Sequence, residues 1–268
     1  MLQIPSIIML SAAAAIIAVA GFLIVHRVVK PIDLGEHQGF LDAMLSIVGT
    51  LVSILLGLLV AASLDHYQTL EQSVDTEAAA IGQVYRMSEG LPKDVGERIQ
   101  TLCKEYNRQV VHDEWPAMAR GEYSHKVLVI YAKMLREIVT YEPQTNGKTN
   151  LHNSLLSSVQ QIADSRRQRL LSLHSAWRDH LMPVLLMCSA IVLAFAYLYV
   201  RRGAVLHGIL ICFVAIALGG NLGLVFLLSN PFSGDWQIRP RSFELNAQVL
   251  KEIQNSSELK DVTDINRF

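Results

Sequence analysis

Residues 43–64 read AMLSIVGTLVSILLGLLVAASL, an apolar run without a charged side chain. As a helix that rises 1.5 Å per residue, this run is long enough to cross the hydrocarbon core of a bilayer, which is about 30 Å thick. Neither proline nor glycine occurs between Leu58 and Ile81. The sequence therefore predicts that the same helix leaves the membrane near Asp65 and continues into a polar domain.

One face of this predicted span carries small or hydroxyl-bearing residues at spacings of three and four, which places them on one side of a helix. They are Ser46, Gly49, Thr50, Ser53, Gly57 and Ala61. Such a face either lets helices pack closely in lipid or lines a water-filled path, and both interpretations stay open at this stage. If it lines a pore, either the pore is lined by these small residues or Ile54 and Leu58 turn inward as an apolar gate.

Three further apolar blocks indicate a membrane protein with four spans. They are Ile4–Val25, Leu181–Val200 and Val205–Leu228. The first block lacks a preceding basic residue and is longer than the core of a secretory signal, so we expect it to be retained. Helical periodicity between the second and third spans predicts an all-α fold, with an extramembrane bundle formed by extensions of those two spans. The predicted parts are 1–64 with the first two spans, 65–178 with the helical domain, 179–230 with the last two spans, and 231–268 with an Asn-Pro-Phe turn, a short amphipathic helix and a tail that is polar from Asn255.

Composition excludes several classes of function. The formal net charge is −1, and the segment between the second and third spans holds equal numbers of acidic and basic residues, which does not fit a nucleic-acid-binding surface. The three cysteines are scattered and form neither a disulfide framework nor a metal motif. The sequence contains no HExxH, GxSxG or Walker-type motif. We therefore expect no enzyme activity, no metal and no cofactor.

Two groups of polar residues in the helical domain invite an interpretation. Glu77 precedes a run of small residues and has basic candidates for a partner in Arg166, Arg167 and Arg169. The set is either an interhelical ion pair that fixes register or an ion site, and the ion pair is favoured. The triplet at positions 112–114, His-Asp-Glu, is interpreted as solvated surface because adjacent residues point to different helix faces.

Further polar residues lie in or after the fourth span. Asn221 forms either an interhelical hydrogen bond or a contact with a pore. The turn after the span is rich in helix breakers and oxygen atoms, and it either terminates the helix or holds a hard cation. Its residues of interest are Asn230, Pro231, Phe232, Gly234 and Asp235.

With these segments identified, the chain resembles the bestrophin-like family of bacterial and plant membrane proteins from about Gly39 to Phe243. The matching features are the glycine- and leucine-rich second span, Glu77-Ala78-Ala79-Ala80-Ile81-Gly82, Leu91-Pro92, Tyr106, Glu114-Trp115-Pro116, Arg166-Arg167-Gln168-Arg169-Leu170 and Asn230-Pro231-Phe232-Ser233-Gly234. The order of these motifs relative to the spans makes the set specific.

The resemblance implies a ring-shaped homo-oligomer, a pentamer, whose pore is lined by the second span and conducts inorganic ions. The sequence departs from bestrophins at the calcium clasp, because Trp236-Gln237-Ile238-Arg239 stands where that clasp is acidic, and calcium control stays an open question at this stage. We therefore predict an oligomeric ion channel or channel-like protein that crosses the cell's inner (plasma) membrane several times and has the lipid bilayer, its own copies and inorganic ions as partners. The alternative, from another class, is a membrane-anchored scaffold or sensor whose helical domain binds a protein.

Overall fold

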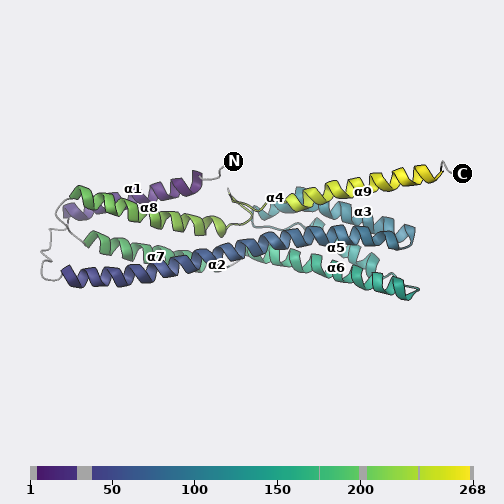
Figure 1. Cartoon of the computed structure of the whole chain (residues 1–268), viewed down its shortest axis with the longest axis horizontal. Helices are drawn as coiled ribbons and strands as arrows, with labels where there is room; N and C mark the ends of the chain where they lie inside the picture. Colours follow the sequence, from purple (N-terminus) through teal and green to yellow (C-terminus); the bar gives the residue numbers. More distant parts are fainter. Residues whose placement is uncertain (1–4, 29–37, 175, 199–203, 235, 266–268) are drawn as a thin grey trace. The chain divides into compact units, whose positions relative to one another are not determined.

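The computed structural model describes residues 5–28, 38–174, 176–198, 204–234 and 236–265, and these residues form helices and turns but no strand. The α-helices are α1 (Pro5–Val28), α2 (Gln38–Met87), α3 (Lys93–Gln109), α4 (Trp115–Met118), α5 (His125–Val139), α6 (Asn146–Leu171), α7 (Ala176–Leu198), α8 (Ala204–Leu228) and α9 (Arg241–Ile265). A π-helical turn, Val110–Glu114, joins α3 to α4. The predicted all-α fold is confirmed (Figure 1).

The chain divides into two compact units. Unit 1 comprises Met1–Tyr67 and Ser175–Trp236, and unit 2 comprises Gln68–His174 and Gln237–Phe268. Unit 1 therefore holds α1, α7, α8 and the first part of α2, whereas unit 2 holds the remainder of α2 with α3 to α6 and α9. Helix α2 is unbroken from Gln38 to Met87. The absence of proline and glycine between Leu58 and Ile81 predicts this continuity for its middle part.

Three helices are long and apolar enough to cross a membrane, within the residues that the structure describes. The apolar segments lie at Ile7–Arg27 in α1, from Asp42 onward in α2, and at Val205–Leu228 in α8. In α7 the apolar segment is shorter and covers Met182–Tyr197. The end of the predicted third span, Val200, lies outside the described residues, so the fourth crossing remains a prediction.

Small residues bring α1 and α8 into close contact in unit 1. A Cβ added at Gly219 would lie 2.5 Å from the Ala14 Cβ and 3.2 Å from the Ser11 Cα. Around this contact, Ala15, Ala18 and Phe22 pack against Ile211 and Ala215. In lipid the hydrophobic effect does not draw helices together, so close van der Waals packing must do so. Glycine and alanine allow it because they let two backbones approach closely.

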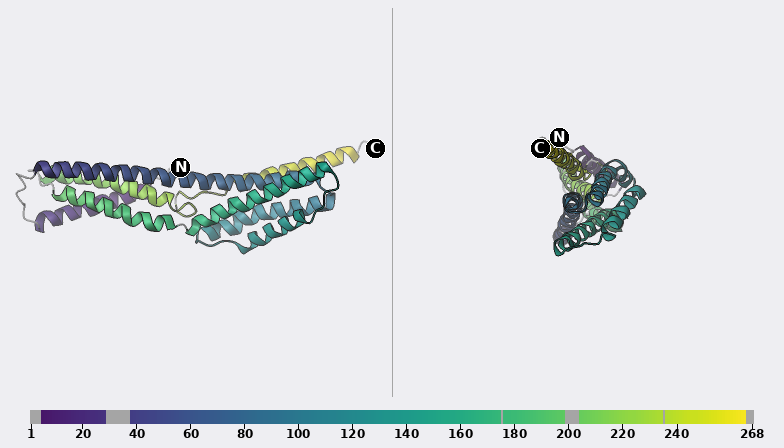
Figure 2. Two further views of the ribbon diagram at one scale, coloured as in Figure 1. Left: turned by 90° about the horizontal axis from the view of Figure 1, so that it is seen from below. Right: turned by 90° about the vertical axis from the view of Figure 1, so that its right-hand side faces the viewer.

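The part of α2 that lies in unit 1 packs against its neighbours through one row of apolar residues, the seam. Val52, Leu56 and Leu59 are buried against Leu185 of α7 and Val225 of α8. Figure 2 shows this part of α2 running alongside α7 and α8. The seam leaves the small-residue face of α2 outside the contact.

The core of unit 2 is formed by one apolar stripe from each of its longer helices. Its fully buried members include Ile81, Val84, Ile99, Cys103, Tyr106, Val127, Met134, Ile138, Leu155, Val159, Ile162, Phe243 and Leu250. Hydroxyl caps set two of the helix starts, because Ser124 accepts from the Val127 N–H at α5 and Thr145 accepts from the Lys148 N–H at α6.

Side-chain amides attach α9 to the other helices of unit 2. The Asn246 Nδ2 donates to the Ala78 carbonyl oxygen over 3.0 Å, and the Asn107 Nδ2 donates to the Phe243 carbonyl oxygen over 2.8 Å. The helix continues past Asn255, where the sequence analysis expected the polar tail to begin, and ends at Ile265. A helix that is anchored in its first turns extends by one hydrogen bond per added residue, which offsets the polar composition.

Gly219→Ala tests the contact between α1 and α8. We expect it to destabilise the protein by about 1–3 kcal/mol, because the new methyl group overlaps Ala14. The measurement is the thermal unfolding midpoint in detergent. The matched control is Gly49→Ala in α2, where an added Cβ would meet nothing within 4 Å. Equal midpoints for the two variants would contradict the packing described here.

Candidate functional site

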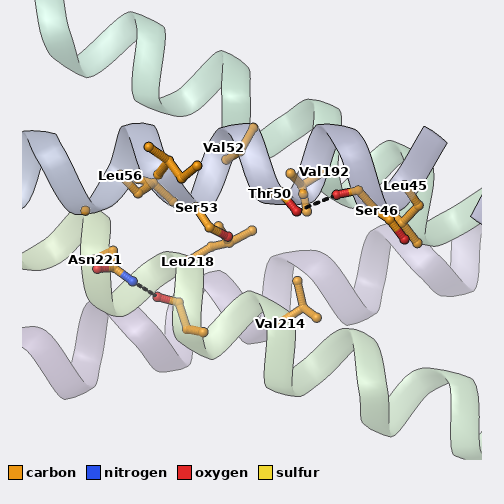
Figure 3. Close-up of a pocket in the computed structure, with 14 residues that line it drawn as sticks. Leu45, Ser46, Thr50, Val52, Ser53, Leu56, Val192, Val214, Leu218 and Asn221 are labelled. Atoms are coloured by element: carbon orange, nitrogen blue, oxygen red, sulfur yellow. Dashed lines mark hydrogen bonds between the residues drawn. The ribbon is translucent and has the colours of Figure 1, made fainter. Parts of the chain in front are cut away.

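The small-residue face of α2 borders an open groove in unit 1. The groove has a volume of about 750 Å³ and lies between α2 and α8, with Val192 of α7 at one side. Figure 3 shows side chains from α2 and α8 facing one another across it. Of the residues predicted to line a pore, those that border the groove are Ser46, Gly49, Thr50, Ser53, Ile54 and Gly57. Leu58 does not border it, but its side chain is 64% exposed.

Two hydroxyl groups of this face have their hydrogens directed to the helix itself. The Ser46 Oγ lies 2.8 Å from the Asp42 carbonyl oxygen, and the Thr50 Oγ1 lies 2.7 Å from the Ser46 carbonyl oxygen. A carbonyl oxygen can only accept, so each hydroxyl must be the donor in its contact. What these two groups offer to the groove is therefore oxygen lone pairs.

Asn221 borders the same groove from α8. Its Nδ2 donates to the Ala217 carbonyl oxygen over 2.9 Å, so its amide hydrogens also serve its own helix. The expected interhelical hydrogen bond is not formed within the described residues, because Ala217 lies one turn back on α8. The side-chain carbonyl of Asn221 is left as a further acceptor at the groove.

Unit 2 contains a second candidate, a buried ion cluster made of Glu77, Glu114, Arg166 and Arg169. Glu77, Glu114 and Arg169 have no exposed surface, and Arg166 is 7% exposed. The Arg169 guanidinium donates to both oxygens of Glu77, from Nε over 3.0 Å and from Nη2 over 2.8 Å. The same Nη2 lies 2.9 Å from Glu114 Oε2, and the Arg166 Nε donates to Glu114 Oε1 over 3.1 Å. Two carboxylates thus share two guanidinium groups, and the cluster is neutral.

Aromatic side chains enclose the cluster and connect it to the segment before α9. The Tyr106 hydroxyl donates to Glu77 Oε1 over 2.7 Å. The Trp115 ring lies beneath the Arg169 guanidinium, 5.1 Å from its centre to Cζ, and its Nε1 donates to the Ile238 carbonyl oxygen over 3.0 Å. Trp115 also meets Phe243 edge to face. The cluster is therefore closed off from water by residues of α3, α4 and α9.

The two carboxyl groups differ in their electrostatic surroundings. Burial raises the pKa of Glu77, and the single guanidinium of Arg169 together with the Tyr106 hydroxyl offsets this rise only in part. Burial also acts to raise the pKa of Glu114, but there the charges and hydrogen bonds of Arg169 and Arg166 outweigh it and the pKa is lowered. Burial opposes the charge on Arg169, yet its two carboxylates raise its pKa, so Arg169 stays cationic.

Of the four charged residues predicted to interact, the structure brings together Glu77, Arg166 and Arg169, and Glu114 joins them. The Arg167 side chain is exposed and lies 3.9 Å from Asp164, while Arg166 and Arg169 meet Glu77 or Glu114 in the interior. The interpretation of positions 112–114 as solvated surface is wrong for Glu114. Its sequence signal is its place four residues after Val110, on the same stripe as Tyr106.

The turn after α8 is held by its first residues. The Asn230 Nδ2 donates to the Phe226 carbonyl oxygen over 2.7 Å, which satisfies one of the carbonyl groups that a helix leaves free at its C-terminus. Pro231 and Phe232 are buried, and Gly234 has a φ of +85°, which favours glycine. The remaining predicted residue of this turn, Asp235, lies outside the described residues.

Comparison with known proteins confirms the resemblance inferred from the sequence. A family model described as a bestrophin-like domain matches residues 12–243. Among curated proteins, none matches the chain. A crystal structure of a membrane protein variant is 12% identical with a TM-score of 0.65, and the match covers 95% of this chain and 100% of that one.

Two crystal structures of a bacterial bestrophin homologue from Klebsiella pneumoniae, each with one substitution, are also similar. The first is 13% identical with a TM-score of 0.63 and covers 95% of this chain and 100% of the other. The second is 12% identical with a TM-score of 0.64, covering 94% and 99%. At such identities the likeness shows the fold.

Arg169→Met tests the buried ion cluster. Removing this guanidinium leaves Glu77 without its charge partner and Glu114 with one, so we expect a loss of about 3–5 kcal/mol in the free energy of unfolding. The matched control is Arg167→Met, whose side chain is 76% exposed and which we expect to stay within about 0.5 kcal/mol. Thermal unfolding in detergent is the measurement. A similar, small effect of both substitutions would contradict the importance of the cluster.

Glu114→Gln tests the lowered pKa of Glu114. A carboxyl group whose pKa is lowered by folding stabilises the protein above its ordinary pKa of 4.5, and this stabilisation is lost as the pH falls through the folded pKa. Glu77, whose pKa is raised, acts in the opposite sense in both proteins. We expect the gap between the unfolding midpoints of wild type and variant to be largest near neutral pH and to narrow in acid. Glu97→Gln, at an exposed site, should show no such narrowing.

Proposed function

Since the chain belongs to the bestrophin-like family, we propose that it forms an oligomeric ion channel in the cell's inner membrane, with the membrane part of α2 lining the pore. The family and the similar folds support a channel-like membrane protein. The finer proposal, that copies of this chain surround a common axis with α2 innermost, rests on the chemistry of one helix face.

The observation that carries the proposal is a polar face left unused by the packing of unit 1. Ser46, Thr50 and Ser53 are exposed, whereas the seam residues of the same helix are buried. A Cβ added at Gly49 or Gly57 would meet nothing within 4 Å, so these glycines are not needed for contacts within one copy. Lipid tails cannot hydrogen-bond to such a face, but water along a pore can.

The large apolar residues next to this face supply a candidate gate. Ile54 is 57% exposed and Leu58 is 64% exposed. They lie about one turn apart, beside the small residues, so in a ring of copies they would form an apolar constriction next to the hydroxyl-bearing face. Apolar constrictions of this kind close a pore by excluding water. The proposed oligomer is a ring, and five copies are the number implied by the family resemblance.

The test is ion flux through vesicles that contain the purified protein. Gly57→Leu and Ser53→Leu each place a bulky side chain in open space on the groove, so we expect flux to fall to the level of protein-free vesicles while the oligomer stays intact. Ala190→Leu adds bulk at an exposed position of α7 and should leave flux unchanged.

Two results would contradict the proposed channel. One is the absence of flux from an intact wild-type oligomer. The other is loss of the oligomer in Gly57→Leu, together with recovery of a specific protein partner on the wild type, which would favour the membrane-anchored scaffold or sensor in which the small face only packs spans together.

A further inference from the structure

The first turn of α6 contains the single Asn-Gly pair of the sequence, Asn146-Gly147. Asn146 is the first residue of the helix, and Thr145 is its N-cap. Both members of the pair are exposed, and the loop that precedes them lies at an end of unit 2 (Figure 1). A Cβ added at Gly147 would meet nothing within 4 Å, so packing within the chain does not require a glycine at this position.

The two groups of this pair that can react with each other are not held by hydrogen bonds. The side-chain amide of Asn146 has no hydrogen-bond partner in the part of the chain that the structure describes. The Lys148 N–H donates to the Thr145 Oγ1 over 3.3 Å, and the Thr149 N–H donates to the Thr145 carbonyl oxygen over 2.9 Å. The Gly147 N–H lies in the first turn, whose donors have no acceptor inside the helix. The nitrogen of Gly147 is therefore available.

An asparagine that precedes a glycine can react with the backbone. The Gly147 nitrogen attacks the Asn146 Cγ and closes a cyclic imide, while the side-chain nitrogen leaves as ammonia and takes the proton that the Gly147 nitrogen loses. Water then adds to either carbonyl of the imide and opens it to an aspartyl or an isoaspartyl residue. One water is consumed and one ammonia is released, without an oxidant or a reductant. Glycine favours the attack because it has no side chain to shield its nitrogen.

Helical structure opposes this reaction, and α6 opposes it least at its start. In a regular helix the peptide group after Asn146 is turned away from the side chain, so the first turn must open before the nitrogen reaches Cγ. Helix ends fray at a free-energy cost near zero. Asn153 in the same helix is also exposed and is followed by the small Ser154. There, however, each backbone N–H is bonded to the carbonyl four residues earlier, and the attack requires the interior of the helix to open.

We propose that Asn146 is a site of spontaneous deamidation and that its two products act on α6 in opposite directions. The aspartyl product places a negative charge in the first turn, where the helix dipole stabilises it. The isoaspartyl product inserts a methylene group into the main chain between Thr145 and Gly147. This insertion displaces Thr145 from the Lys148 and Thr149 N–H groups, so the cap of α6 is lost.

The experiment follows the purified full-length protein during incubation in detergent at mildly alkaline pH. Peptide mass spectrometry measures the exchange of an amide for a carboxyl group, and chromatography separates the aspartyl from the isoaspartyl peptide. We expect both products to accumulate at Asn146 while Asn153 keeps its amide. In Gly147→Ala, whose methyl group enters open space, accumulation should slow. In Thr145→Val, which removes the capping hydroxyl but keeps the shape of the side chain, it should become faster.

A second measurement tests the opposite effects of the products. Asn146→Asp reproduces the aspartyl product and should unfold at the same temperature as fresh wild type or a higher one, whereas aged wild type enriched in the isoaspartyl form should unfold at a lower one. Equal accumulation at Asn146 and Asn153, or an unchanged rate in Gly147→Ala, overturns the proposed site. An unchanged rate in Thr145→Val overturns the control by fraying of the first turn. None of these readouts depends on ion flux, so their failure leaves the channel proposal standing.

Discussion

A guanidinium group enclosed in protein, that of Arg169, is the constraint on which unit 2 depends. Its charge must be neutralised on site, and the two carboxylates that do so come from α2 and from the π-helical turn before α4. The cluster therefore joins three segments that are distant in sequence. A buried ion pair adds little stability compared with an apolar core of the same volume, but removing one partner is costly.

Helix α2 contributes to both units with one continuous backbone. In unit 1 its seam is apolar and one of its other faces carries hydroxyl groups, whereas in unit 2 its inner face carries Glu77 and its outer face is polar. Sharp kinks arise at prolines and at glycines, and α2 has neither between Leu58 and Ile81. Its glycines Gly39, Gly49 and Gly57 lie in unit 1, and Gly82 lies at the contact with α9, where it makes room for Asn246.

Much of this architecture could be predicted from the sequence, and the misses have physical causes. Hydropathy and the lack of breakers predicted the long helix, and the motif order predicted the family. Glu114 was missed because the polar triplet at positions 112–114 was interpreted as a group. Its single member on the stripe of Tyr106 and Val110 is buried, whereas His112 is exposed. Arg167 was included because three arginines close together in sequence cannot be ranked without knowing which face of α6 is buried. Which arginine pairs with a carboxylate depends on where Glu77 lies relative to α6, and this is determined by tertiary packing.

The ion cluster also determines which residues of α2 face outward in unit 2. Successive residues of a helix are about 100° apart, so the direction of Glu77 fixes the directions of Asp75 and Glu71 on the same helix. Because Glu77 must meet Arg169, α2 cannot turn about its axis within unit 2 without leaving the buried charge of Glu77 unpaired. Asp75 and Glu71 are thereby held in the exposed region of the helix, and neither needs an inward contact with a basic residue to stay there. The buried carboxylate and the exposed ones are thus parts of one arrangement, in which the pairing of the first maintains the orientation of the others.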